Sequence, residues 1–303
     1  MTKASDLVRS EDLYPTRDGR STRCFERADP VVHAPQLRGP LDELQVARYQ
    51  RDGFLVLPSL LSAGEVAELR VGLETIRRTE RGGVEAGVIR ERGGDAVRSV
   101  FAVHERPDVF GALARHATLV GAARQILDDE IYVHQSRVNF KPALVGKSFG
   151  WHSDFETWHA EDGMPRMRAL SASVLLDPNH AWNGPLMLLP GSHRTFVSCP
   201  TPTPPDNHRL SLVDQQIGTP SSDALCALFD DVSRIDLALG PEGTVVLFDC
   251  NTMHASSSNL SPLPRSNVFL VYNALSNRLV APFAAPAPRP AFLATREPVP
   301  ITS

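Results

Sequence analysis

The chain has 303 residues, of which 42% are hydrophobic, and this is enough to bury a substantial core. Its formal net charge of −4 offers no basic surface that would hold nucleic acid or an anionic membrane. The sequence shows no apolar leader or membrane-length apolar run, and its cysteines have neither disulfide-framework nor metal-binding spacing: Cys24, Cys199, Cys226 and Cys250. We therefore expect a globular protein of the cytoplasm that binds neither nucleic acid nor membrane.

The first part of the chain combines an irregular arm with capped helices. Residues 1–40 are polar and rich in turn residues, which predicts an arm lying over the body of the protein. Asp42 can cap a short helix that ends at residues 52–53, and residues 54–57 then predict a buried strand. A capping-box pattern at Ser62 and Glu65 predicts a second helix, whose apolar positions have helical spacing: Val66, Leu69, Leu73 and Ile76.

The pattern of apolar residues changes near residue 131. Before it, residues 81–94 predict a loop, residues 96–103 a strand, and Pro107 the start of one helix that ends near Asp128. After it come short apolar runs separated by turns: residues 131–133, 171–176, 186–189, 244–248 and 267–273. Many short strands indicate a mainly β protein with flanking helices, built as a β-sandwich or jelly roll.

Two segments stand apart from this pattern. Residues 198–236 open with a proline-rich run and contain a short predicted helix at 224–229, which is typical of an insertion that acts as a lid. Residues 281–303 begin with an Ala/Pro-rich run, which predicts an extended tail along the surface. We expect a single domain over residues 1–303.

Residues 149–163 contain two metal-ligand side chains, His152 and Asp154. If the segment is extended, both project from the same face and can hold one ion. His254 follows a predicted buried strand and is the best third ligand. Two histidines and one carboxylate leave one face of a metal open, which suits non-haem Fe(II) that must bind a cosubstrate and O2.

Arg265 starts the next predicted strand after His254. In an antiparallel hairpin it would lie beside the histidine-bearing strand and point into the same cavity. Its planar guanidinium can hold the distal carboxylate of a dicarboxylate cosubstrate. His159 does not continue the alternation of His152 and Asp154, so we expect it to be a hydrogen-bonding loop residue.

Several runs resemble the ectoine hydroxylases, which belong to the phytanoyl-CoA dioxygenase superfamily of Fe(II)- and 2-oxoglutarate-dependent enzymes. The pattern HxD…H…R is general to the superfamily, whereas HSDFETWH followed by EDG, within residues 152–163, is specific to ectoine hydroxylases. The similarity extends from residue 12 to residue 273, with further matching runs at 135–139, 183–187, 190–193, 248–251, 253–254 and 264–267. Gly150 and the turn at 177–180 depart from the family pattern.

The resemblance implies a double-stranded β-helix core with Fe(II) bound by His152, Asp154 and His254. It also implies that 2-oxoglutarate chelates the iron, with its distal carboxylate on Arg265. The remaining implied cosubstrate positions are Asn139, Phe149 and Ser256. The implied substrate positions are Gln135, Trp158, Ala169, Phe248, Asn267 and Phe269. Their chemistry suits ectoine, a zwitterion with a delocalised ring cation, because aromatic faces attract cations and the amides can donate and accept hydrogen bonds.

The implied reaction is hydroxylation of ectoine to 5-hydroxyectoine with release of succinate and CO2, which produces a compatible solute that protects against osmotic and thermal stress. Asp154 favours hydroxylation over halogenation, and the resemblance also suggests a homodimer. One alternative is the same chemistry on another small zwitterion, such as the cyclic amino acid proline. A second is a non-catalytic jelly-roll module with structural zinc, which is disfavoured because such sites use four protein ligands and no convincing fourth is present.

Overall fold

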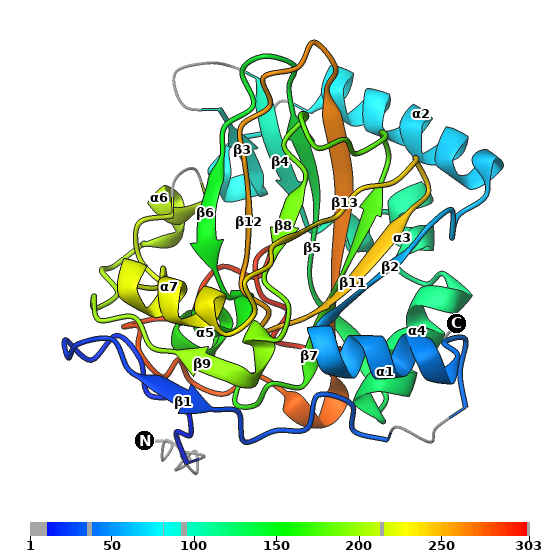
Figure 1. The fold of residues 1–303 in the computed structure, drawn as a ribbon. Coiled ribbons are helices and arrows are strands. Elements are labelled where there is room, and N and C mark those ends of the chain that lie inside the picture. The colour runs from blue at the N-terminus through cyan, green and yellow to red at the C-terminus, as the bar shows by residue number, and fades with distance from the viewer. Residues whose placement is uncertain (1–10, 35–37, 81, 92–95, 213–214, 302–303) are drawn as a thin grey trace, which may run out of the picture.

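A computed structural model describes residues 11–34, 38–80, 82–91, 96–212 and 215–301. Parts of four predicted segments lie outside this description: residues 1–10 and 35–37 of the arm, 81 and 92–94 of the loop, 213–214 of the insertion and 302–303 of the tail. Within the described residues, the strands form a seven-stranded and a four-stranded sheet, both antiparallel, and a two-stranded ribbon (Figure 1). The predicted mainly β jelly roll with flanking helices is confirmed.

The strands of the large sheet, in spatial order, are β2 (Phe54–Leu57), β11 (Val245–Asp249), β7 (Ala169–Leu175), β13 (Arg265–Ala274), β5 (Ile131–Lys141), β4 (Val97–Phe101) and β3 (Val88–Arg90). Those of the small sheet are β10 (Asp236–Leu237), β8 (Leu186–Leu188), β12 (His254–Ser256) and β6 (Phe149–His152), and the ribbon pairs β1 (Cys24–Glu26) with β9 (Thr195–Val197). The helices are α1 (Glu43–Asp52), α2 (Ala63–Thr79), α3 (Val109–Leu113), α4 (Ala117–Leu127), α5 (Asp154–Thr157), α6 (His208–Ser211) and α7 (Ser222–Asp230). Short 3-10 turns lie at η1 (Val84–Ala86), η2 (Val103–Glu105), η4 (Ser192–Arg194) and η5 (Leu275–Asn277), and η3 (Trp158–Asp162) is a π-helical turn.

The large sheet has two different faces because side chains alternate along each strand. On β13, Val268 and Leu270 belong to the main core, which includes apolar residues of α1 to α4. Arg265 and Phe269, on the other face of the same strand, line a cavity that also receives residues of the small sheet. One face of the large sheet therefore stabilises the fold, and the other forms part of the site.

The first two helices are confirmed together with their caps. Asp42 caps α1, which ends at Gly53 with a φ of 82°. A left-handed residue at this place favours glycine, because other side chains are strained there. Ser62 and Glu65 form the expected capping box of α2. Strand β2 follows α1 directly, as predicted, and pairs with β11.

The single helix predicted from residue 107 to 128 is wrong, because the chain forms α3 and α4 with a break before Ala117. Phe110 and Leu119 are both in the main core, although they are nine positions apart. At 100° per residue, one straight helix would place them about 180° apart, on opposite faces. The break allows both to reach the same core.

The predicted short runs correspond to β5, β7, β8, β11 and β13. Strand β5 is much longer than residues 131–133, since polar residues that face the cavity interrupt its apolar pattern. The loop predicted at 81–94 is partly wrong, because β3 lies within it and pairs with β4. The helix predicted at 224–229 is confirmed as α7.

Residues 149–163 are only partly extended. Strand β6 ends at His152, and Asp154 begins α5, which continues into η3. The prediction that His152 and Asp154 project from one extended strand is therefore wrong, and the two side chains meet through a strand-to-helix turn.

The tail also differs from a purely surface segment. Leu293 and Ala294 are fully buried, and Arg289 is 9% exposed. Prolines prevent a regular helix, but the tail packs against the same helical segment as the N-terminal arm, at the lower side of the molecule in Figure 1. The single domain over residues 1–303 and the role of residues 198–236 as a lid stay predictions. Among the described residues, no helix is both long and apolar enough to cross a membrane.

Candidate active site

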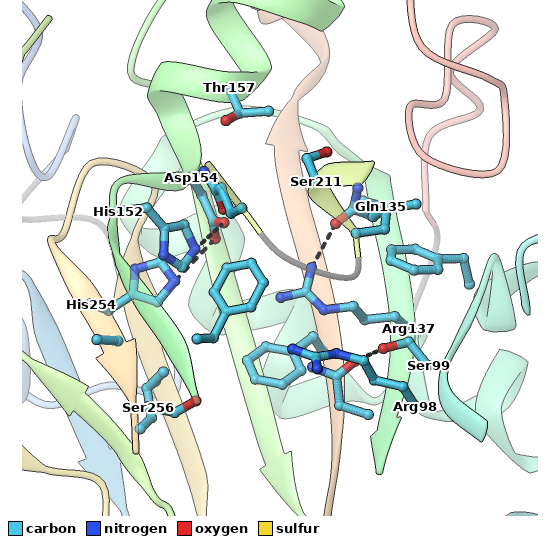
Figure 2. Close-up of a pocket in the computed structure, with 18 of the residues that line it drawn as sticks. Arg98, Ser99, Gln135, Arg137, His152, Asp154, Thr157, Ser211, His254 and Ser256 are labelled. Carbon is cyan, nitrogen blue, oxygen red and sulfur yellow. Dashed lines mark hydrogen bonds and ion pairs between the residues drawn. The ribbon is translucent and has the colours of Figure 1, made fainter. Parts of the chain in front are cut away.

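The structure brings His152, Asp154 and His254 together at one side of the cavity (Figure 2). One ligand atom from each lies within 4.8 Å of the others, and all three residues are buried. The Nε2 atom of His152 is 3.6 Å from one Asp154 oxygen, and that of His254 is 3.9 Å from the other. His152 and His254 face each other across the register of β6 and β12. These distances leave room for an ion among the three side chains.

Backbone carbonyls orient both imidazoles. Nδ1 of His152 lies 2.8 Å from the carbonyl oxygen of Gly150, and Nδ1 of His254 lies 2.9 Å from that of Thr252. A carbonyl only accepts, so each Nδ1 must carry the proton. The unprotonated Nε2 atoms then face Asp154, as a metal ion requires of its histidine ligands.

Burial favours the neutral form of His254 and lowers its pKa to about 4, with a smaller contribution from His152. Burial alone would raise the pKa of Asp154, but the neighbouring His254 and His152 hold it well below the ordinary range. At neutral pH His254 thus supplies a neutral nitrogen and Asp154 a carboxylate. This donor set fits Fe(II), which accepts histidine and carboxylate ligands on one face and keeps other positions open.

A cavity of about 1180 Å³, including its open mouth, adjoins the three ligands. One end is cationic, where Arg265 and Lys141 both line the wall. Nζ of Lys141 donates to the Ser256 hydroxyl over 2.9 Å and to the Ser257 carbonyl over 2.6 Å. Burial, and then the charge of Arg265, lowers the pKa of Lys141 to about 6. A bound carboxylate would relieve this unfavourable burial of two cations.

All four predicted cosubstrate residues line this cavity: Arg265, Ser256, Asn139 and Phe149. Arg265 reaches it for a different reason from the one predicted, because β12 and β13 belong to different sheets and form no hairpin. Phe149 stacks edge-on against His152, with ring centroids 4.8 Å apart. The Asn139 amide oxygen accepts a hydrogen bond from Ser99 over 2.8 Å, which fixes its orientation.

The predicted substrate residues divide into two groups. Gln135, Trp158 and Phe269 line the cavity, and Gln135 is held by a 2.7 Å hydrogen bond to the Leu293 carbonyl in the tail. The other three are absent from the lining formed by the described residues: Ala169, Phe248 and Asn267. The Phe248 ring contacts the His254 ring, with centroids 5.0 Å apart. The Asn267 amide oxygen accepts hydrogen bonds from the Ser173 hydroxyl over 3.0 Å and from Nη1 of Arg265 over 3.1 Å. Ala169 packs in the same apolar cluster as Trp158.

Several cations that the structure places in the cavity wall were not predicted from the sequence, among them Arg137 and Lys141. Arg137 projects into the middle of the cavity (Figure 2), donates to Gln135 over 2.8 Å and stacks over the Phe269 ring at 4.7 Å. Both cations could have been found from the period of two in a strand, because they alternate with the predicted Gln135 and Asn139 on β5.

His159 is not a metal ligand. Its two ring nitrogens contact the Met164 carbonyl at 2.8 Å and Asp12 at 3.0 Å, and its ring stacks on Phe283 at 4.0 Å. The structure thus agrees with a hydrogen-bonding role. Gly150, the unusual residue before Trp151, has no atom within 4 Å of where a Cβ would lie. A larger side chain there would meet open space.

The jelly roll and the two-histidine, one-carboxylate site define a non-haem iron oxygenase architecture. The chain belongs to the phytanoyl-CoA dioxygenase (PhyH) family, whose sequence model matches residues 49–267. It is similar to the ectoine dioxygenase of Stutzerimonas stutzeri (strain A1501), with 50% identity over 94% of this chain and 95% of that protein. The ectoine dioxygenase of Nocardia farcinica (strain IFM 10152) is 45% identical over 98% of this chain and 97% of its own length.

Solved structures support the same relationship. The crystal structure of EctD from S. alaskensis with 2-oxoglutarate and 5-hydroxyectoine has a TM-score of 0.87 and 44% identity. It covers 96% of this chain, and this chain covers 97% of it. The structure of the same protein with bound Fe has a TM-score of 0.86 over the same shares of the two chains.

Proposed function

We propose that the protein hydroxylates ectoine to 5-hydroxyectoine, using Fe(II), 2-oxoglutarate and O2 and releasing succinate and CO2. The observation that carries this proposal is the His152, Asp154 and His254 cluster beside a cavity with one cationic end. The 50% identity to an ectoine dioxygenase over nearly the full length supports the choice of substrate.

His152, Asp154 and His254 would hold the iron through Nε2, one carboxylate oxygen and Nε2. When bound, the iron together with 2-oxoglutarate and O2 supplies the oxidant that converts a C–H bond into C–OH. The protein contributes binding, orientation and the exclusion of water. Because both Nδ1 protons are held by backbone carbonyls, neither histidine can rotate its lone pair away from the metal.

The cosubstrate would lie with its distal carboxylate at Arg265, Lys141 and the Ser256 hydroxyl. Two cations and one hydroxyl match a carboxylate, which accepts several charge-assisted hydrogen bonds. Nε of Arg265 is buried, and it has no hydrogen-bond partner among the described residues. Such a donor is costly unless a ligand satisfies it.

The substrate would occupy the opposite part of the cavity, between Trp158 and Phe269. Aromatic faces attract the delocalised ring cation of ectoine, and the amide of Gln135 can bond to the ring nitrogens or the carboxylate. Arg137 adds a partly buried cation next to Gln135 that suits the ectoine carboxylate. A zwitterion therefore finds aromatic faces for its cation and Arg137 for its carboxylate. An uncharged substrate would leave Arg137 without a counter-charge.

The test is a panel of small zwitterions assayed for succinate release by the purified protein with Fe(II), 2-oxoglutarate and O2. We expect ectoine to give the highest kcat/KM and proline to give little turnover, and His152→Ala to abolish turnover with every substrate. A higher kcat/KM with a cyclic amino acid would replace ectoine as the substrate and keep the iron chemistry. Tight zinc without any 2-oxoglutarate affinity would instead favour a non-catalytic module.

We also propose that the enzyme is a cytoplasmic homodimer. The cysteines are free, including the buried Cys199 and Cys250, which is compatible with a reducing compartment. Sedimentation analysis of the purified protein should give twice the monomer mass of 33.1 kDa, and a monomer at micromolar concentration would contradict the dimer.

A further inference from the structure

The helical segment that carries Asp154 and Trp158 is held from outside the jelly roll by the N-terminal arm. Arg17 lies on that arm and its side chain is fully buried. It forms a fork with Glu156, with Nε 2.9 Å from one carboxylate oxygen and Nη2 2.7 Å from the other. Its Nη1 also donates to Glu161, one turn further along the same segment. A single guanidinium therefore joins α5 to η3.

These contacts reach the cavity wall within very few residues. Glu156 is two positions from the ligand Asp154, and Glu161 is three from Trp158. Thr157, which lines the cavity, accepts a further hydrogen bond from Arg17 over 3.2 Å. Glu161 lines the cavity as well. A change at Arg17 would thus displace the wall opposite the cosubstrate end.

The charge balance makes Arg17 hard to replace. Glu156 and Glu161 are both buried, with side-chain exposures of 1% and 3%, and Arg17 is the cation in contact with both. Thr16 donates to Glu156 and Asn207 to Glu161, so both carboxylates are hydrogen-bonded as well as paired. A carboxylate left without its cation in such a place is strongly unfavourable.

The backbone conformation of Arg17 is also unusual, with a φ of 56°. Non-glycine residues seldom adopt the left-handed region, and they persist there where surrounding contacts determine the geometry. Here the Arg17 amide donates to the Cys199 carbonyl over 2.7 Å, which fixes the arm against the insertion. The segment that Arg17 holds is itself irregular, because η3 is a π turn, a rare form that is frequent at functional sites.

The tail provides a second support at the other end of η3. Arg289 pairs with Asp162 through two hydrogen bonds of 2.8 and 2.6 Å. Gly163, with a φ of 79°, ends the turn, and a Cβ there would lie 2.2 Å from the Val280 carbonyl oxygen. Apolar contacts such as Tyr14 against Phe155 anchor the segment as a whole. Arg17 is different because it bonds directly to both the helical and the π-helical turn.

We propose that Arg17 is a positioning residue for the reaction, which fixes α5 and η3 so that Trp158 and Thr157 hold the substrate in register with the metal bound at Asp154. This inference rests on the proposed function of the site. It assigns the N-terminal arm a part in substrate binding, because its residues complete the wall from outside the jelly roll.

The test compares Arg17→Lys with the wild-type enzyme. Lysine keeps the charge inside the cluster, so the protein should fold, but it cannot form the fork to Glu156 or bridge both carboxylates. Since small displacements in a site are costly, we expect the substrate KM to rise by about tenfold or more. The KM for 2-oxoglutarate should stay unchanged, because β5, β12 and β13 form that end of the cavity. More succinate should also be released per hydroxylated product.

Two further variants complete the comparison. If Arg17→Met folds, its substrate KM should rise more than in Arg17→Lys, again with an unchanged KM for 2-oxoglutarate. Arg20→Met is the matched control, because Arg20 lies on the same arm with a side chain 73% exposed. Arg20→Met should match the wild type. Calorimetric titration of the anaerobic Fe(II) and 2-oxoglutarate complex with substrate gives a readout without turnover, in which Arg17→Lys should bind more weakly.

The proposal is overturned if folded Arg17→Lys keeps the wild-type substrate affinity and ratio of succinate to product. It is also overturned if Arg17→Lys lowers kcat and leaves the substrate KM unchanged. A preparation in which fewer molecules are active gives that result without any displacement of the substrate. If the proposed function fails, the wild type itself would turn over a substrate other than ectoine, which distinguishes that failure from a failure of the role of Arg17. The same comparison would be made with that substrate.

Discussion

Nζ of Lys141 lies 2.9 Å from the hydroxyl of Ser256, at the end of the cavity that Arg265 also lines. Lys141 ends β5 and Ser256 ends β12. Together with Arg265 they offer a carboxylate two cationic groups and one hydroxyl, whereas the sequence predicted only one cation there, Arg265. Substitution of Lys141 by methionine should raise the KM for 2-oxoglutarate by roughly 10- to 100-fold, because hydrogen bonds to charged groups contribute about 1.5–3 kcal/mol. Steady-state kinetics with each substrate varied in turn would check this.

The same substitution separates binding from folding. Lys141→Met would remove a buried amino group that donates to one hydroxyl and two backbone carbonyls. It pairs with no carboxylate among the described residues, so no buried charge loses its partner and the Tm of the ligand-free protein should not fall. The substrate KM should stay near the wild-type value. A large loss of Tm together with equal changes in both KM values would show that Lys141 has a structural role instead.

Lys141 also predicts how cosubstrate binding depends on pH. In the ligand-free protein its pKa is about 6, so it is mostly neutral at a pH well above this value. A bound dianion favours the charged form and raises this pKa, so binding must take up a proton once the pH exceeds the ligand-free pKa. Affinity for 2-oxoglutarate should therefore be highest near pH 6 and decline as pH rises, and Lys141→Met should lack this decline. Calorimetry in buffers of different ionisation enthalpy measures the proton uptake directly.

Removal of the metal gives a third expectation. Fe(II) binds only the folded protein, so it should raise the free energy of unfolding by about 2.7 kcal/mol when its concentration is about 100 times the Kd. Thermal melts under anaerobic conditions, with and without a chelator, measure the shift in Tm. The variants His254→Ala and Asp154→Ala should show no such shift. An unchanged shift in either variant would place the metal elsewhere.

Gly150 offers a test of the departure from the family pattern. The space around its Cβ position is open, and the residue lies in β6, where glycine is unfavourable. Gly150→Tyr should leave kcat/KM for the substrate unchanged and raise the Tm slightly. A marked change in substrate range would mean that this position shapes the cavity after all.

The metal ligands could be predicted from the sequence because they stand in short, recognisable runs. Asp154 was placed correctly for the wrong reason, since spacing alone did not reveal that β6 gives way to α5. Arg265 likewise lines the same cavity as His254, but it does so from the other sheet and not from a hairpin. Local patterns thus pointed to residues that the structure brings together, but not to the elements that present them.

The supporting contacts could not be predicted, because they join residues far apart in the chain. Arg17 and Glu156 are 139 positions apart, and nothing in either local pattern indicates that they meet. Arg137 and Lys141 are a different case, since alternation along β5 would have placed them beside Gln135 and Asn139. They were missed because β5 was predicted to be too short.

The identity of the product formed from ectoine decides whether the protein is an ectoine hydroxylase. Purified protein with Fe(II), 2-oxoglutarate, O2 and ectoine should form 5-hydroxyectoine, recognised by mass and NMR, in equal amount to succinate and CO2. The matched reaction with His152→Ala should form neither product. If the wild type with verified bound iron and intact fold formed no hydroxylated ectoine, the account of this site would be contradicted.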